Sequence, residues 1–148
     1  MCAEATCGVR VYANSQVLVI ANDIAEITRA AKFIEEFCAA QGTTPDTAFK
    51  INLAVEEALV NTISHGFKDD ARHAIELRIA IENGAIVLGV SDDAVAFNPL
   101  EAPLPDVDAP VDERAVGGLG VFLMRTTMDD IQYIREDGQN KLTLTKRL

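Results

Sequence analysis

The feature that most constrains this chain is residues 51–67, which read INLAVEEALVNTISHGF. The segment has the length and pattern of a helix that is apolar on nearly every side, and such a helix is usually buried. Glu57, Asn61 and His65 recur every four residues within it, so they form one polar stripe along the helix. A carboxylate and a carboxamide are costly to bury unless something binds them. The segment therefore predicts a helix whose polar stripe lines a binding site.

Composition narrows the class of protein. The 148 residues are 49 % hydrophobic, which favours one folded domain with its own core. A net charge of −10 argues against nucleic-acid binding. No apolar run reaches the roughly 20 residues of a membrane span, and the N-terminus, MCAEATCGVR, lacks the features of a secretory signal. Cys2, Cys7 and Cys38 form no CxxC pair and fit free thiols in a reducing compartment, so we expect a cytoplasmic protein.

Strand and helix signals alternate along the chain. Residues 85–91 are the most continuously apolar strand segment, which predicts a central strand. The order of elements predicts an α+β fold, a two-layer α/β sandwich with a mixed, mostly antiparallel sheet and helices on one face. The predicted strands are 9–13, 16–20, 74–82, 85–91, 131–135 and 141–148, with turns at 14–15, 83–84 and 137–138, and the predicted helices are 24–40, 44–66 and 117–128.

One long segment carries neither pattern. Residues 98–116 hold four of the five prolines and a run of acidic residues. Loops of this length are uncommon and are often functional lids. We therefore predict a lid at 98–116, a loose tail at 1–7, and a single domain over 1–148.

Glu57 and Asn61 are the first candidates for chemistry. An Asn oxygen suits Mg²⁺, which takes few protein ligands, and a Glu one turn earlier can accept a proton. Glu56 is rotated by about 100° from Glu57 on a helix, so it is the second choice as a base. By spacing alone, an exposed polar pair is the commoner meaning of this pattern.

Two further candidates lie far away in sequence. Asp92 ends a predicted strand, where its carboxylate could accept a hydrogen bond from an adenine amino group, although turn acids are common at such places. Gly117, Gly118 and Gly120 open a predicted helix. Glycines allow close approach of a phosphate to the free amides of a helix N-terminus, although they also suit a flexible entry to a helix.

The chain carries the Glu57–Asn61 pair first, then Asp92, and then the glycines at 117–120, with a long loop between Asp92 and the glycines. In this order, the three signals resemble the ATP-binding domain of the histidine-kinase, gyrase and heat-shock-protein ATPase superfamily. Within it they look most like the small anti-sigma-factor serine/threonine kinases. The resemblance implies the Bergerat-type ATP-binding fold. It is carried by EEALVNTISHGF at 56–67, by VSDD and FNP within 90–99, by GGLGVFLMRTTMDDIQYIRE at 117–136, and by KLTLTKRL at 141–148.

The resemblance also implies roles. Glu57 would be the general base toward a substrate serine, Asn61 would bind the Mg²⁺ that bridges the ATP phosphates, and Asp92 would contact adenine. His65 near the stripe could approach the nucleotide, or could simply be hydrogen-bonded at a helix end. The full predicted ATP site is Asn61, His65, Asp92, Ala94, Phe97, Arg114, Gly117, Gly118, Leu119 and Gly120.

Two positions depart from the family's pattern. Ala94 stands where the family's first glycine box has glycine. If the backbone there has a positive φ, the alanine is strained by about 1 kcal/mol, and a nearby nucleotide would meet its methyl group. Val116 precedes the glycines where some relatives have a basic residue, which leaves Arg114 as the nearest cation.

The leading functional hypothesis is therefore a protein serine/threonine kinase that uses ATP and Mg²⁺. It would phosphorylate a serine on a STAS-like anti-sigma-factor antagonist and bind a sigma factor otherwise. The alternative is an ATP-responsive or nucleotide-free module that sequesters a partner without catalysis. A plain ATPase subunit is less favoured, because no transducer domain follows Leu148 in this sequence. By analogy, the alternating N-terminal strand or an exposed sheet edge could pair in a homodimer, whereas nucleic acid and membrane are not expected partners.

Overall fold

The computed structural model describes residues 9–12, 14–101 and 118–148, with only the backbone of Gly118 and Leu119. Six strands form one sheet in the order β1-β2-β3-β4-β6-β5, and all five strand pairs are antiparallel. The predicted tail and most of the predicted lid lie outside the described residues. The strands are β1 Val9–Val11, β2 Ser15–Ala21, β3 Ala74–Glu82, β4 Ala85–Asp92, β5 Asp130–Glu136 and β6 Gln139–Arg147.

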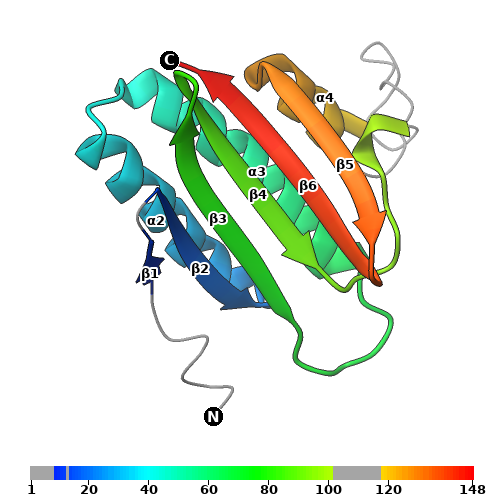
Figure 1. Ribbon diagram of the computed structural model, residues 1–148. Helices are drawn as coiled ribbons and strands as arrows, with labels where there is room; N and C mark the ends of the chain where they lie inside the picture. Colours follow the sequence, from blue (N-terminus) through cyan, green and yellow to red (C-terminus); the bar gives the residue numbers. More distant parts are fainter. Residues whose placement is uncertain (1–8, 13, 102–117) are drawn as a thin grey trace.

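The helices pack on one face of this sheet (Figure 1). The predicted two-layer sandwich is confirmed, and the pairing of the described strands is antiparallel throughout rather than mixed. β4 is central, as predicted, because it pairs with both β3 and β6. The helical elements are η1 Ile24–Glu26, α2 Ile27–Ala40, α3 Pro45–His65, η2 Pro99–Glu101 and α4 Gly118–Thr127.

The helix boundaries follow from local capping chemistry. The Thr44 hydroxyl accepts a hydrogen bond from Thr47 N at 3.2 Å, and Pro45 occupies the first turn of α3, where its missing N–H costs nothing. The Asp23 carboxylate accepts from Ala25 N at 2.9 Å. That cap starts a 3-10 turn rather than an α-helix, so α2 begins at Ile27, three residues later than predicted.

The core lies between the inner face of the sheet and the helices. Alternating residues of the central strands are buried against α2, α3 and α4, because successive side chains of a strand point to opposite faces. In contrast to our prediction, α3 is not buried on nearly every side, since Leu53 and Val60 are only half-buried. The fully buried side chains include Ile20, Ile34, Ile51, Leu59, Ile75, Leu77, Ile79, Ile86, Leu88, Met124 and Leu144.

Two tight turns set the register of the β3–β4 and β5–β6 hairpins. Asn83 and Gly84 have φ of 52° and 76°, and Asp137 and Gly138 have φ of 54° and 75°. Positive φ at both central residues is the signature of the two-residue hairpin turn that matches the twist of its strands. The two hairpins then pair through β4 and β6, and that pairing, which no tight turn connects, places Asp92 of β4 directly opposite Asn140 of β6.

Two smaller findings bear on the sequence predictions. Within the described residues, no helix is both long and apolar enough to cross a lipid bilayer. Cys38 is a buried free thiol, as expected, whereas Cys2 and Cys7 lie outside the described residues.

Candidate functional site

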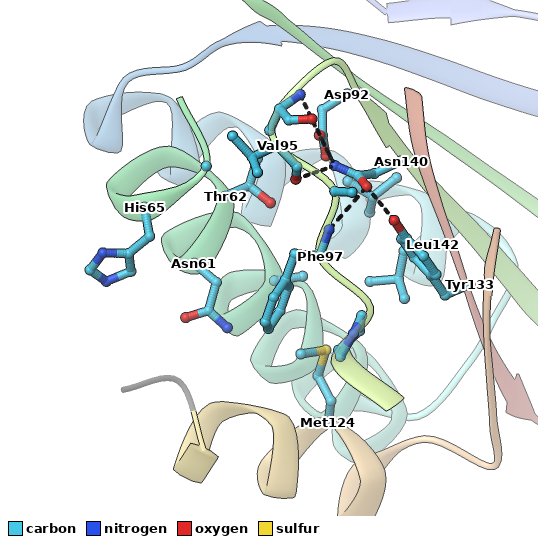
Figure 2. Close-up of a pocket in the computed structure, with 16 residues that line it drawn as sticks. Asn61, Thr62, His65, Asp92, Val95, Phe97, Met124, Tyr133, Asn140 and Leu142 are labelled. Atoms are coloured by element: carbon cyan, nitrogen blue, oxygen red, sulfur yellow. Dashed lines mark hydrogen bonds between the residues drawn. The ribbon is translucent and has the colours of Figure 1, made fainter. Parts of the chain in front are cut away.

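A cavity of about 240 Å³ lies between α3, the turn that follows β4, and strands β5 and β6 (Figure 2). The fold brings together segments that are far apart in the sequence, since α3 approaches the turn after the central strand. Five of the predicted site residues line this cavity: Asn61, His65, Asp92, Ala94 and Phe97.

Asp92 lies at the polar side of the cavity and is only 5 % exposed. Its Oδ1 accepts hydrogen bonds from Ala94 N and from Asn140 Nδ2, both at 3.0 Å. Burial raises the pKa of the carboxyl above its ordinary value, and these two hydrogen bonds partly oppose that rise. No described residue donates to Oδ2, so this oxygen can accept from a ligand.

Asn140 organises this side of the cavity, and our sequence analysis missed it. Its Nδ2 donates to Asp92 Oδ1, to Val95 O at 3.0 Å and to Ala94 O at 3.3 Å. Its Oδ1 accepts from Phe97 N at 3.3 Å and from the Tyr133 hydroxyl. The buried Asn140 side chain therefore connects Asp92, the predicted adenine contact, to the turn that follows β4. We refer to Asp92, Ala94, Tyr133 and Asn140 as the strand end of the site.

Ala94 is accommodated without backbone strain. Among the described residues, only Asn83 and Asp137 are non-glycine residues with positive φ, so the strain considered for Ala94 is absent. Its carbonyl accepts from Arg135 Nη1 at 2.7 Å. The methyl group packs against Gly66, where an added Cβ would lie 2.8 Å from Ala94 Cβ and 2.6 Å from Thr62 O. The extra methyl at position 94 thus fits because residue 66 has no side chain.

Asn61 presents a different situation on the helix side of the cavity. Its Nδ2 is buried and has no hydrogen-bond partner among the described residues. Buried polar atoms are nearly always satisfied in folded proteins, so an orphan needs an explanation such as a ligand. Figure 2 shows the Asn61 amide on the opposite side of Phe97 from the Asp92–Asn140 hydrogen bonds.

Glu57 lies one helical turn before Asn61 and contacts the start of α4. A Cβ built on Gly120 would lie 2.5 Å from Glu57 Oε2, so the carboxylate rests against the backbone of the glycine segment. Burial raises the pKa of Glu57, and the neighbouring charge of Glu56 raises it further. The structure thus joins the predicted polar stripe to the predicted glycine segment. We refer to Glu57, Asn61 and Gly120 as the helix end of the site.

The other predicted residues fall into two groups. His65 is exposed and lines only the rim, because its ring points away from Asp92 and Asn140 in Figure 2. Gly118 and Leu119 form the first residues of α4, whereas Arg114 and Gly117 lie outside the described residues. Within the part of the chain that is described, no three His, Cys, Asp or Glu side chains form a metal-binding group.

The sequence matches a known family over most of its length. The profile described as histidine kinase-like ATPase domain matches residues 20–146. The chain therefore belongs to the histidine kinase-like ATPase domain family. The fold agrees with this, since the histidine kinase domain of a blue-light activated histidine kinase from Erythrobacter litoralis superimposes with a TM-score of 0.53 at 23 % identity, over 84 % of this chain and 60 % of that chain.

Individual relatives are named as protein kinases. The chain is 36 % identical over 97 residues to the serine/threonine-protein kinase BtrW of Bordetella bronchiseptica, covering 66 % of this chain and 68 % of that protein. It is 30 % identical over 105 residues to the serine-protein kinase RsbW of Bacillus mycoides, covering 68 % of this chain and 65 % of the relative. The matched region therefore spans about two thirds of the length of these relatives.

Proposed function

We propose that this chain binds ATP with Mg²⁺ in the described cavity and acts as a protein serine/threonine kinase of the anti-sigma type. The observation that carries the proposal is that the strand end and the helix end of the site offer different polar groups to a ligand. The strand end offers a fixed hydrogen-bond acceptor, and the helix end offers an unsatisfied amide beside a carboxylate of raised pKa. Family membership and the names of the relatives support the same reading.

The strand end suits the adenine ring of ATP. Asn140 uses its amide donors on Asp92, Ala94 and Val95, so the group left facing a ligand is the second oxygen of Asp92. A carboxylate oxygen accepts a hydrogen bond from the exocyclic amine of adenine. A mostly apolar cavity with few fixed polar groups is the usual form of such a base-binding site.

The helix end fits a phosphate group with a magnesium ion. The orphan Asn61 Nδ2 can donate to a phosphate oxygen, and Asn61 Oδ1 can serve as the single protein ligand that Mg²⁺ requires when phosphates and waters complete its shell. When bound, the ion would neutralise charge on the transferring phosphoryl group. The close contact between Gly120 and Glu57 brings the backbone of the first turn of α4 beside the helix that carries Asn61, where its amides would favour an anion.

Glu57 is the residue we assign as general base. The pKa of Glu57 is raised, so it lies nearer to neutral pH than the pKa of an ordinary glutamate. A base with such a pKa is better suited to accept a proton from a serine hydroxyl. Its contact with Gly120 holds the carboxylate at the edge of the phosphate position. The substrate we propose is a serine on an anti-sigma-factor antagonist, and a sigma factor is the second proposed partner.

Substitution of Glu57 tests the assignment. In Glu57→Gln, binding of Mg-ATP measured by calorimetry should be retained, whereas transfer of ³²P from γ-labelled ATP to a recombinant STAS-like antagonist should fall by about 10² to 10⁴-fold. The matched control is Glu56→Gln, which changes the adjacent exposed acid and should leave transfer largely intact. Full transfer by Glu57→Gln would assign the base elsewhere, and loss in Glu56→Gln alone would assign it to Glu56.

A second candidate function is a regulatory module that binds a partner without catalysis. The departure at Ala94 favours it, because the methyl group lines the cavity. Titration with Mg-ATP separates the two functions. Absence of binding at millimolar nucleotide would exclude the kinase, whereas binding without transfer to any antagonist would favour an ATP-responsive module.

A further inference from the structure

The loop between α3 and β3 contains a histidine that holds two carboxylates at once. His73 Nε2 lies 2.7 Å from Asp69 Oδ1, and His73 Nδ1 lies 3.1 Å from Asp93 Oδ1. The ring stacks on Phe67 with centroids 4.4 Å apart. His73 N donates to Asn22 Oδ1 at 2.9 Å and His73 O accepts from Asn22 N at 3.1 Å, so the residue is fixed by both its backbone and its ring.

This arrangement is complete only when the ring is protonated. An ionised carboxylate accepts hydrogen bonds and cannot donate them. Both ring nitrogens face such a carboxylate, so both must carry a proton, and only the imidazolium form has two N–H donors. A neutral ring would keep one of the two hydrogen bonds and turn a lone pair toward the other carboxylate.

The loop that carries His73 also contacts the strand end of the site. Asp93 follows Asp92 in the chain, so the His73–Asp93 contact restrains the turn in which Asp92 lies. The start of the same loop meets that turn again, because Gly66 O accepts from Val95 N at 2.8 Å and Gly66 packs against the Ala94 methyl. The turn is therefore held against the loop at two places, of which only the one at His73 can titrate near neutral pH.

We propose that protonated His73 is a positioning residue for nucleotide binding, which fixes the turn carrying Asp92 through its contact with Asp93, so that affinity for Mg-ATP falls as His73 loses its proton. This inference rests on the proposed nucleotide function of the cavity. His73 touches no part of the cavity itself, since it is absent from the lining residues.

The sign of the pH dependence follows from the charges around the ring. The charged groups that face it are Asp69 from its own loop and Asp93 from the turn after β4, while Asn22 and Phe67 are neutral. The hydrogen bond with Asp69, followed by that with Asp93, raises the pKa of His73 above its ordinary value of 6.5. The contacts are therefore fully present below that ordinary value and are lost as pH rises through the raised pKa.

The test compares calorimetric affinities for Mg-ATP from about pH 6 to pH 8.5, the range over which a histidine titrates. The wild-type affinity should weaken roughly two- to fivefold as His73 deprotonates, the size expected for an exposed ion pair. His73→Gln should show the weaker affinity throughout. Ionisation of the nucleotide affects every variant alike, so the difference between the two curves is the readout.

Two neighbouring variants separate the two carboxylates. Asp93→Asn should remove the pH dependence, because the link to the turn is lost. Asp69→Asn should keep the direction of the dependence but move its midpoint to lower pH, which the titration of the His73 ring proton in NMR spectra measures independently. Urea unfolding of each variant shows that the fold is retained.

The outcomes are distinguishable. Parallel curves for wild type and His73→Gln, or full pH dependence in Asp93→Asn, would overturn this inference and leave the kinase proposal standing. Failure of the wild-type protein to bind Mg-ATP at any pH would overturn the proposed function and this inference together.

Discussion

The two ends of the site differ in how completely they are built before any ligand arrives. At the strand end, Asn140 hydrogen-bonds Asp92, Ala94, Val95, Phe97 and Tyr133, and it is 7 % exposed. At the helix end, Asn61 Nδ2 is buried without a partner among the described residues. The strand end is preorganised by the protein, whereas the helix end retains polar capacity that a ligand can satisfy.

The difference has a structural cause. The strand end lies on paired strands, where the register fixes Asp92 opposite Asn140 and a satisfied buried network stabilises one arrangement. The helix end lies where α3 meets the start of α4, and there Asn61 Nδ2 finds no hydrogen-bond partner among the described residues. The comparison predicts that breaking the Asn140 hydrogen-bond network at the strand end costs stability, whereas substitutions at the helix end cost function with little loss of stability.

The largest expected effect on stability is at Asn140. Asn140→Ala leaves several buried polar groups of the turn without a partner, which should lower the free energy of unfolding by about 3 kcal/mol. Urea denaturation measures this. The control is Gln139→Ala, the exposed preceding residue of β6, which should change stability by less than about 0.5 kcal/mol. Equal effects of the two substitutions would remove the distinction drawn for the strand end.

Gly120→Ala, at the helix end, should lower phosphate transfer and leave stability unchanged, the reverse of Asn140→Ala. The new methyl group would displace the Glu57 carboxylate, 2.5 Å away, and misplacement of a catalytic group by about 1 Å can slow a reaction by up to a hundredfold. By the same reasoning, the transfer of labelled phosphate by Gly120→Ala should fall by about tenfold to a hundredfold. Stability should hold, because alanine favours a helix more than glycine does.

Gly89→Ala is the matched control for that substitution. The nearest non-neighbour atom to a Cβ at Gly89 is 4.0 Å away, so the change should leave phosphate transfer unaffected. If Gly120→Ala retained full transfer, the contact between Glu57 and α4 would have no part in catalysis.

Asn61→Leu tests how much the buried, unpaired Asn61 amide lowers the stability of the free protein. Replacing an unsatisfied buried amide by an apolar side chain of similar size should raise the free energy of unfolding by about 1 kcal/mol, while binding of Mg-ATP measured by calorimetry is lost. Asn52→Leu makes the same change elsewhere on α3, away from the cavity lining, and should leave binding intact. A destabilised Asn61→Leu protein would show that Asn61 is satisfied in the free state.

The smallest expected effect concerns the charge on Asp92. Burial raises the pKa of the Asp92 carboxyl above the ordinary 3.8. The native state therefore binds a proton at Asp92 more readily than the unfolded state does. The stability that the protonated carboxyl contributes is lost as pH rises through the raised pKa. Asp92→Asn keeps an oxygen acceptor and should therefore be more stable than wild type at neutral pH, with the advantage disappearing below the ordinary pKa.

Substitution of Asp129 should change stability at neutral pH in the opposite direction to substitution of Asp92. Hydrogen bonding from Arg147 N lowers the pKa of Asp129 below the ordinary 3.8, so its contribution is present above that value and is lost on acidification. Asp129→Asn should therefore be less stable than wild type at neutral pH. Urea midpoints measured from acid to neutral pH test both assignments, and movement of the two variants in the same direction would contradict one of them.

Much of the helix end could be predicted from sequence, because helical spacing is local. Glu57 and Asn61 are one turn apart whatever the rest of the fold does, and a glycine cluster at a helix start has a local signature. Asn140 could not be found this way. An isolated asparagine in a strand carries no periodic signal, and its partner Asp92 lies 48 positions away. Only the pairing of β4 with β6 brings the two side chains together.

The sequence by itself determined the elements, their order, and the family resemblance, because these depend on residue spacing, capping and turn chemistry. The tertiary structure decided which candidates share one site. It placed Glu57 against Gly120 and left His65 at the rim. It also showed that Ala94 has no positive φ and that its methyl group packs against Gly66. Contacts of this kind depend on strand register and on the approach of helices, and neither can be read from local spacing.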